Sequence, residues 1–395
     1  MNSTHQFSKS LFDLEQYVRF HDYSGYDPYD ALNAIKLAAL QNKFLKLAAT
    51  QFFVYSPINL RFFFKINPGK NPKAIGLFLQ AYCKLIKQNY IKKNQFELVS
   101  KQFTKFLIQN RSEGYSEYCW GFNFDWQDRT RYAKKGLPTI VITSYIANAF
   151  LDLYELTNNK QFLDIAQSSC RFLLKDLHIT KTEKGICFSY TPIDQYVVHN
   201  ANALGAALLA RMYSITKEDI LREHSKKAFD FLLSFQKYDG SWAYSINLQT
   251  NKERNQIDFH QGFILDSIHD FINYIEPEEK KYKNALKNGA EFYTQQQFDC
   301  YGGSKWRLPW RWPIDIHNQV QGIITCCKLY NNLKNKNFLI MAKKIALWTV
   351  ENMQNTNGFF YYQKWPLFTN KISYMRWGQA WMMLALATLL DNVDI

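Results

Sequence analysis

The chain alternates between two kinds of apolar segment along most of its length. The first kind is apolar on nearly every side and rich in small residues, as in 203–210. A helix of this composition has to be buried, and its small side chains let neighbouring helices approach closely. In the second kind, apolar residues recur at spacings of three and four with charged residues between them, as at Ala228, Phe231, Leu232 and Phe235. The pattern predicts buried inner helices that alternate with amphipathic outer helices.

The buried segments are copies of one unit. When they are aligned near their starts, successive copies lie 55 to 61 residues apart. An aromatic segment that contains glycine precedes each copy, for example 240–244 and 358–362. A period of this size indicates a repeat architecture. The aligned positions are Tyr145, Asn200, Gln261, Asn318 and Trp377.

This alternation predicts an all-α fold, an (α/α)6 toroid with short aromatic, glycine-rich hairpins or loops at one mouth. The inner helices are expected near 73–87, 142–156, 199–214, 259–274, 317–331 and 374–390. Outer helices are expected near 96–109, 160–175, 219–236, 278–297 and 337–354, and the helix near 31–41 is expected to supply the sixth. The prediction is a single domain, 1–395, in which 1–60 closes the ring and 61–395 form the repeat hairpins.

The composition adds two expectations to this picture. Aromatic residues make up 17% of the 395 residues, enough to line a sugar-binding cleft as well as to fill a wide core. The formal net charge of +14 indicates an anionic partner, such as an acidic polysaccharide, a lipid phosphate or a membrane surface. The sequence contains no basic arm or recognition-helix pattern, so no nucleic acid partner is expected. The oligomeric state is not predicted.

The seven cysteines indicate a reducing compartment. Their number is odd, no CxxC pair occurs, and several lie in apolar helices, as is typical of buried thiols in a cytosolic protein. Segment 1–20 lacks the basic and apolar runs of a signal peptide, and no apolar run reaches about 18 residues. We therefore expect a cytoplasmic protein whose contact with a membrane is at most peripheral.

Candidate chemistry lies where the inner helices are predicted to begin. His199, His260 and His317 occupy the same place in three repeats, and Tyr145 and Arg376 stand at or beside it in two others. A lone histidine is usually a core residue, but three in equivalent positions favour a shared cleft in which they move protons. Helices around a wide ring rarely bring three imidazoles within ligand distance of one metal ion. No metal and no cofactor is therefore expected.

Aspartates form a second group of candidates. Asp125 and Asp128 lie together among aromatic residues, and Asp194 lies shortly before a predicted inner helix. A pair of carboxyl groups, one acid and one base or nucleophile, is what glycoside cleavage requires. Asp258 and Asp315 each stand two residues before a histidine, where an aspartate most often caps a helix.

The segment 305–315, KWRLPWRWPID, is dense in arginine and tryptophan. Guanidinium groups bind carboxylates through paired hydrogen bonds, and indole faces stack on sugar rings. The segment is therefore expected to bind substrate, although stacked packing within a structural loop would produce the same composition. The predicted substrate-binding residues are Tyr190, Asn200, Trp242, Arg307, Trp310, Arg311, Trp312, Tyr374 and Arg376.

Several longer segments resemble known proteins. FQKYDGSWAY at 235–244 and MQNTNGFFYY at 353–362 resemble the glycine–aromatic turns of two α/α-toroid superfamilies, the six-hairpin carbohydrate enzymes and the terpenoid cyclases with prenyltransferases. The acidic DxDD and DDxxD signatures of the second group are absent, which makes an isoprenoid enzyme the lesser alternative. GYDPYDALN, SPINLR, NPKAIGLFLQAY, WGFNFDWQDR and HNANALGA resemble a bacterial family usually encoded with capsule, O-antigen or exopolysaccharide biosynthesis genes. This resemblance spans almost the whole chain and implies a pathway and a fold, but no catalytic residue carries over from it.

These features predict a carbohydrate-active enzyme of surface-polysaccharide metabolism that acts on an acidic, uronate-containing glycan or its lipid-linked precursor. Lyase or C5-epimerase chemistry would use Tyr145, His199 or His260 to move the proton. Arg307 or Arg311 would then neutralise the uronate carboxylate. Hydrolysis would instead pair Asp125 with Asp128 or Asp194. The alternative from another class is a non-catalytic protein of glycan binding or polysaccharide assembly that keeps the same cleft.

Overall fold

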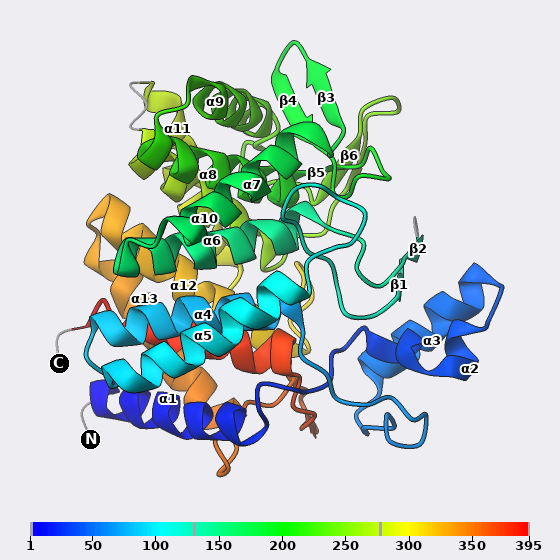
Figure 1. The fold of residues 1–395 in the computed structure, drawn as a ribbon. Coiled ribbons are helices and arrows are strands. Elements are labelled where there is room, and N and C mark those ends of the chain that lie inside the picture. Colours follow the sequence, from blue (N-terminus) through cyan, green and yellow to red (C-terminus); the bar gives the residue numbers. More distant parts are fainter. Residues whose placement is uncertain (1–2, 129–131, 276–278, 394–395) are drawn as a thin grey trace.

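Six helices form a closed inner ring in the computed structural model, which describes residues 3–128, 132–275 and 279–393. They are α4 (Pro72–Lys87), α6 (Ile140–Thr157), α8 (His199–Thr216), α10 (His260–Ile275), α12 (Ile316–Leu333) and α14 (Trp381–Leu390), the last preceded by the π-helical turn η2 (Met375–Ala380). Each helix packs against the next, and α14 packs against α4, so the ring closes (Figure 1). The near-continuous burial of these helices explains why their sequences are apolar on almost every side.

A second layer of amphipathic helices surrounds this ring. Five of them pack against the inner helix that precedes them: α5 (Lys93–Gln109), α7 (Lys160–Lys175), α9 (Asp219–Leu233), α11 (Lys280–Gln296) and α13 (Lys336–Met353). The sixth is α1 (Ser3–Phe20), which packs against α14 and α13. Six inner and six outer helices confirm the predicted (α/α)6 toroid.

The prediction that 31–41 supplies the sixth outer helix is wrong. This stretch forms the short turn η1 (Asp30–Asn33) and the single turn α2 (Ile35–Ala38), which lie with α3 (Lys43–Tyr55) beside the mouth of the ring (Figure 1). In α1, by contrast, apolar residues recur at three and four over the whole helix and are buried. That longer amphipathic face is what an outer helix requires. The single domain remains a prediction, since a folding unit is defined by cooperative unfolding.

Glycines at equivalent places show that α1 is the structural counterpart of the other outer helices. Gly240, Gly302 and Gly358 each open an aromatic segment with a positive φ, between 92° and 97°. A Cβ atom on these residues would lie within 2.1 to 2.6 Å of a backbone carbonyl oxygen of α11, α13 and α1, respectively. Only glycine permits so close an approach together with this φ. The repeat therefore fixes the distance between each aromatic segment and the next outer helix.

Short strands connect the helices at one end of the ring. Two antiparallel hairpins pair β1 (Trp126–Gln127) with β2 (Tyr132–Ala133), and β3 (Ile179–Thr182) with β4 (Gly185–Phe188). Two three-stranded sheets run in the order β5 (Val197–Val198), β6 (Ser245–Asn247), β7 (Lys252–Arg254) and β10 (Thr369–Asn370), β9 (Gln363–Lys364), β8 (Ile314–Asp315). Strands β5 and β8 lead directly into α8 and α12. The hairpins thus surround the N-terminal ends of the inner helices, as predicted.

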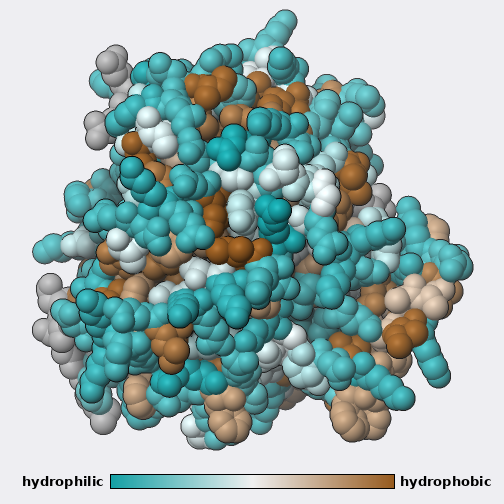
Figure 2. Space-filling model, in the orientation of Figure 1, coloured by the Kyte–Doolittle hydropathy of each residue, from teal (hydrophilic) through white to brown (hydrophobic). Residues whose placement is uncertain are grey.

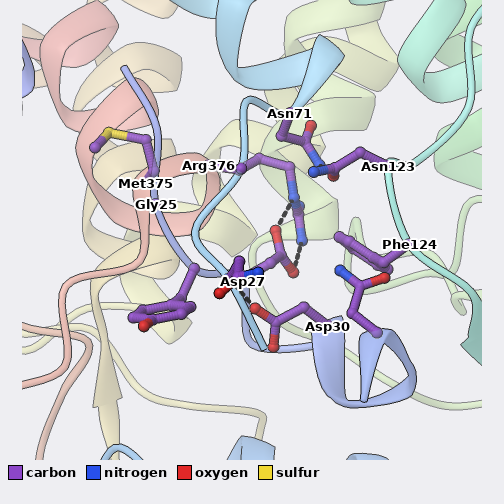
Figure 3. A pocket seen from close by; sticks show the side chains of 12 residues that line it. Gly25, Asp27, Asp30, Asn71, Asn123, Phe124, Met375 and Arg376 are labelled. Carbon is purple, nitrogen blue, oxygen red and sulfur yellow. Dashed lines mark hydrogen bonds and ion pairs between the residues drawn. The ribbon is translucent and has the colours of Figure 1, made fainter. Parts of the chain in front are cut away.

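A buried ion pair and a buried hydrogen bond tie the N-terminal segment to the start of the last inner helix, and Figure 3 shows the ion pair, between Asp27 and Arg376. Arg376 donates to both carboxylate oxygens of Asp27, at 2.5 and 2.7 Å. Arg61 donates to Asp30 at 2.7 Å and to the hydroxyl of Tyr374 at 3.0 Å. Burial raises the pKa of Asp30 to about 6 in spite of the neighbouring Arg61. Paired guanidinium and carboxylate groups with so little exposure fix the segment in one position.

Candidate active site

A cleft of about 520 Å³ opens at the mouth of the ring. Its floor and walls come from the first turns of inner helices, the aromatic hairpins and one side of α3, including Leu47 and Gln51. Of the residues predicted from the sequence, seven line it: Asp128, Tyr190, Asn200, His260, Arg307, His317 and Arg376.

His260 is held by a carboxylate at the start of α10. Asp258 Oδ1 accepts hydrogen bonds from Nδ1 of His260 at 2.5 Å and from its backbone N–H at 3.1 Å. The other oxygen, Oδ2, accepts from Gln256 Nε2 at 2.8 Å. Burial alone would raise the pKa of Asp258, but His260 and these hydrogen bonds more than offset it and lower the pKa. Because an ionised carboxylate only accepts, Nδ1 of His260 carries a hydrogen and its Nε2 is left for a ligand.

His317 is oriented by the neighbouring repeat. Its Nδ1 lies 3.1 Å from the carbonyl oxygen of Trp377, which only accepts, and its ring stacks on the Trp377 indole with 4.3 Å between centroids. Burial, Lys73 and Arg376 lower the pKa of His317 well below its usual range. The neutral ring therefore has its hydrogen on Nδ1 and a lone pair on Nε2, the form of a general base.

The two imidazoles lie on either side of one phenyl ring. The centroid of Phe259 is 4.1 Å from that of His260 and 4.5 Å from that of His317. Both rings are thus close enough to contact the same sugar residue. No side chain among the described residues is bonded to Nε2 of either histidine.

Asp315 caps α12 as predicted, with Oδ1 accepting from the backbone N–H of His317 at 2.9 Å. The same oxygen accepts from Trp377 Nε1 at 2.9 Å, and Oδ2 accepts from Gln363 Nε2 at 2.8 Å. Burial raises the pKa of Asp315 to about 6. Asp315 lines the cleft and also fixes the indole against which His317 stacks.

Two arginines bring positive charge to the cleft wall. Arg307 stacks on Trp306, and its Nε, 3.8 Å from Asp258 Oδ2, has no hydrogen-bond partner among the described residues. Arg254 stacks on Tyr244 and donates to Gln256 at 2.7 Å. Arg307 lines the cleft with 35% of its side chain exposed, and a guanidinium beside aromatic faces is suited to bind a carboxylate.

Lys73 is a site residue that sequence reasoning missed. It lies in the first turn of α4, is only 5% exposed, and its Nζ faces the rings of Tyr145, Trp381 and Phe263 at 4.4, 5.1 and 5.8 Å. Burial and the nearby Arg376 lower the pKa of Lys73 well below its usual range. Its place at the start of an inner helix is the one that histidine takes in later repeats, which is the signal that could have identified it. Sequence reasoning also missed three other cleft residues, Arg254, Gln256 and Trp377. Each contacts another site residue: Arg254 stacks on Tyr244, Gln256 bonds to Asp258, and Trp377 stacks on His317.

Four residues predicted to be catalytic lie outside the cleft lining. His199 is fully buried, with Nδ1 bonded to the carbonyl oxygen of Ala243 at 2.8 Å and its ring stacked on Phe235. Asp125 accepts from the Tyr132 hydroxyl and from the backbone N–H of Lys135. Asp194 accepts from three groups of its own turn, as a turn-forming aspartate does. Tyr145 lies behind the lining, with its ring against Lys73.

The segment 305–315 divides into two parts. Arg307 and Trp310 pair across a tight turn. Beyond Arg307 the turn lies outside the cleft lining, and Trp310 is 66% exposed. Arg311 donates to Asp299 at 2.8 Å outside the cleft. Trp312 packs on the core, as Trp242 does. Of this segment, Trp306, Arg307 and Asp315 line the cleft, whereas Trp310, Arg311 and Trp312 do not. Tyr374, also predicted to bind substrate, is buried outside the cleft lining, against Arg61.

The described part of the chain holds no group of three or more His, Cys, Asp or Glu side chains placed to bind a metal ion. Among its helices, none combines the length and the apolar character that crossing a bilayer requires.

Comparisons with known proteins identify the architecture. No protein-family model matches the chain, and no curated protein matches it in sequence. Solved structures do match. A family 76 α-mannanase from Bacteroides thetaiotaomicron shares 13% identity over 83% of this chain and 88% of that chain, with a TM-score of 0.64. A cellobiose 2-epimerase from Bacillus thermoamylovorans shares 13% over 82% and 88%, with a TM-score of 0.65. A Listeria innocua protein, Lin0763, shares 14% over 98% and 97%, also at 0.65. At these identities the similarity establishes the fold alone, the (α/α)6 toroid.

Proposed function

We propose that this protein is a carbohydrate-active enzyme that moves a proton at a carbon atom of a sugar, as an epimerase or a lyase. The observation that carries the proposal is the pair His260 and His317. They stand at equivalent positions on adjacent inner helices, each has Nδ1 engaged by a fixed acceptor, and each leaves Nε2 for a ligand in one cleft. Sugar epimerases are among the structures to which the chain is similar.

The two histidines would have different roles, His317 as the base and His260 as the acid. His317, kept neutral by its surroundings, would take the proton from a carbon next to a carboxylate, and the electron pair would move onto that carboxylate. His260, protonated on both ring nitrogens with its Nδ1–H held by Asp258, would then give the proton on Nε2 to the opposite face of the carbon, which completes an epimerisation. Alternatively it would protonate the departing glycosidic oxygen as the electron pair forms a double bond, which completes an elimination.

An acidic sugar fits the arginines. As the proton leaves, negative charge grows on the substrate carboxylate, and a guanidinium at that point stabilises the charge. Arg307 lines the cleft beside the His260–Asp258 pair, with 35% of its side chain exposed. The proposed substrate is therefore a uronate-containing oligosaccharide or its lipid-linked precursor, in the metabolism of a bacterial surface polysaccharide.

The test measures exchange or loss of the hydrogen on the carbon next to the substrate carboxylate. The protein is incubated with acidic oligosaccharides in D₂O, and NMR records deuterium next to the carboxylate while absorbance records any new unsaturated uronate. We expect one of these signals, abolished by His317→Gln and weakened at least about tenfold by Arg307→Ala. Arg311→Ala, which changes an arginine outside the cleft, is the matched control and should act like the wild type. Absence of both signals with every acidic glycan tested would reject the proposal.

Glycoside hydrolysis is a second candidate, favoured by one observation. Asp128 and Asp315 both line the cleft, and the pKa of Asp315, raised to about 6 by burial, is typical of a general acid. Family 76 glycoside hydrolases are also among the similar structures. New reducing ends, lost in Asp128→Asn and retained in His317→Gln, would favour hydrolysis over proton transfer.

A further inference from the structure

The segment 30–70 forms a lobe that stands out from the ring beside the mouth (Figure 1). We call it the N-terminal lobe. Its outer surface carries large apolar side chains that the described structure leaves uncovered. The exposed fractions reach 87% for Ile35, 69% for Phe44, 81% for Phe62 and 76% for Phe63. Brown and tan apolar spheres mark this lobe at the right and lower right of Figure 2.

The helix α3 is apolar on two sides, of which one has no partner. On one side Thr50, Phe53 and Val54 are buried, and Phe53 forms a small core of the lobe with Ala31, Ala34 and Ile66. Phe44 and Phe52 lie eight residues apart, and therefore on one face of the helix, and both are more than half exposed. The lobe thus keeps a row of phenyl rings in water, at a cost in free energy that a binding partner would remove.

The lobe is basic. From 30 to 70 the chain contains five lysines and one arginine, and Asp30 is its one acidic residue. Arg61 is buried and paired with Asp30, and Lys70 is paired with Asp22. Lys36, Lys43 and Lys65 are exposed, next to the exposed apolar residues in sequence. Apolar side chains flanked by lysines are the pattern of a segment that lies in the surface of an anionic bilayer.

We propose that the N-terminal lobe docks the protein on an anionic lipid bilayer, with Phe44, Phe52, Phe62 and Phe63 entering the headgroup region and the lysines contacting lipid phosphates. Charge complementarity selects this partner. Two copies of the lobe would bring lysines against lysines, and lysine is depleted in the cores of protein–protein interfaces. Anionic lipid, in contrast, satisfies the apolar and the basic residues at once.

The docking surface and the cleft share α3. Leu47, Gln51 and Val54 of this helix line the cleft, while Phe44 and Phe52 lie on its exposed side. Docking would therefore hold the cleft at the membrane surface, where a lipid-linked sugar is presented. Vesicle binding needs no substrate, so its outcome is independent of the reaction proposed above.

The experiment is co-sedimentation of the full chain with vesicles of phosphatidylcholine, with and without phosphatidylglycerol. We expect binding to the vesicles that contain phosphatidylglycerol and at least tenfold weaker binding to phosphatidylcholine alone. Phe62→Ser with Phe63→Ser should reduce binding at least tenfold, since these exposed side chains are not needed for folding. Leu98→Ser with Ile340→Ser changes exposed apolar residues on outer helices and is the matched control.

A charge variant separates lipid phosphate from apolar adhesion. Lys36→Glu with Lys43→Glu should weaken binding to anionic vesicles at least tenfold and remove its salt dependence. Binding that is equal on neutral and anionic vesicles, or unchanged in the Phe62 and Phe63 variant, would overturn the proposal. So would self-association that rises with protein concentration and disappears in that variant, because the lobe would then cover a second copy of the chain.

Discussion

Replacing Asp258 with asparagine tests the arrangement around His260 most directly. The carboxylate accepts two N–H groups on Oδ1 and one on Oδ2, so each oxygen faces a donor. An asparagine has one acceptor and one NH₂ group in the same space. With its oxygen toward His260, the NH₂ group meets the NH₂ group of Gln256. That glutamine cannot turn over freely, because its oxygen accepts from Arg254 at 2.7 Å.

The other orientation changes the tautomer of the histidine. With the asparagine NH₂ toward His260, Nδ1 must accept and the only ring hydrogen lies on Nε2, so the doubly protonated ring that returns the proton is disfavoured. Loss of a positioned acid–base group costs about 10²- to 10⁴-fold in rate. A buried group left without its partner costs about 1–3 kcal/mol in the free energy of unfolding. We expect both effects in Asp258→Asn.

The assay is the initial rate of deuterium incorporation at saturating substrate, together with unfolding by urea. The loss should fall on kcat more than on KM, because the change affects the acid–base group His260 and not the groups that bind substrate. Asp299→Asn, which removes a carboxylate paired with Arg311 at the surface, is the control and should leave the rate unchanged. An Asp258→Asn protein whose kcat stays within about threefold of the wild type would refute the role given to the Asp258–His260 pair.

Three further predictions concern the buried side chains of Lys73, His317 and Arg376. Lys73→Met removes a buried amine with no hydrogen bond in the described residues, so it should raise the free energy of unfolding by about 1 kcal/mol, as measured by urea unfolding. The same change should lower the rate of deuterium incorporation. His317 has a lowered pKa in the folded state, so the unfolded chain binds more protons and stability should fall as pH drops below about 6.5, less steeply in His317→Gln; urea unfolding at several pH values measures the slope. Arg376→Met leaves Asp27 buried without its partner and should cost about 3–5 kcal/mol, against less than about 1 kcal/mol for Arg311→Met at the surface; a loss below 1 kcal/mol for Arg376→Met would contradict the role of this ion pair in holding the N-terminal segment.

The fold could be predicted because the signals that specify it are local and repeated. Inner helices are apolar all round, outer helices are apolar on one face, and the interval between copies is nearly constant. The identity of the sixth outer helix could not be found in the same way. Residues 31–41 contain helix-forming residues, but α1 presents a longer amphipathic face, and its contact with Gly358 becomes visible only when the ring is closed.

The candidate site was predicted only in part, because the orientation of its side chains depends on contacts with residues of other repeats. His199 and His317 hold equivalent places, and Nδ1 of each is bonded to a backbone carbonyl of a later segment, Ala243 and Trp377. What differs is the ring that the later segment supplies. Phe235 stacks on His199 in the core, whereas Trp377 stacks on His317 within the cleft lining. Equivalence in sequence therefore fixed the backbone position of each histidine but not its access to a ligand.

Contacts between repeats also explain why the sequence predicted only a capping role for Asp258 and Asp315. A local rule correctly assigns Asp315 as the cap of its helix, since the backbone N–H it accepts is two residues away. The remaining acceptor capacity goes to Gln363 and Trp377, which are 48 and 62 residues further along the chain. Asp258 likewise combines a local bond to the backbone of His260 with one to its ring. A residue that satisfies a helix terminus with one lone pair can orient a histidine or its stacking partner with another, and only the closed ring determines which groups these are.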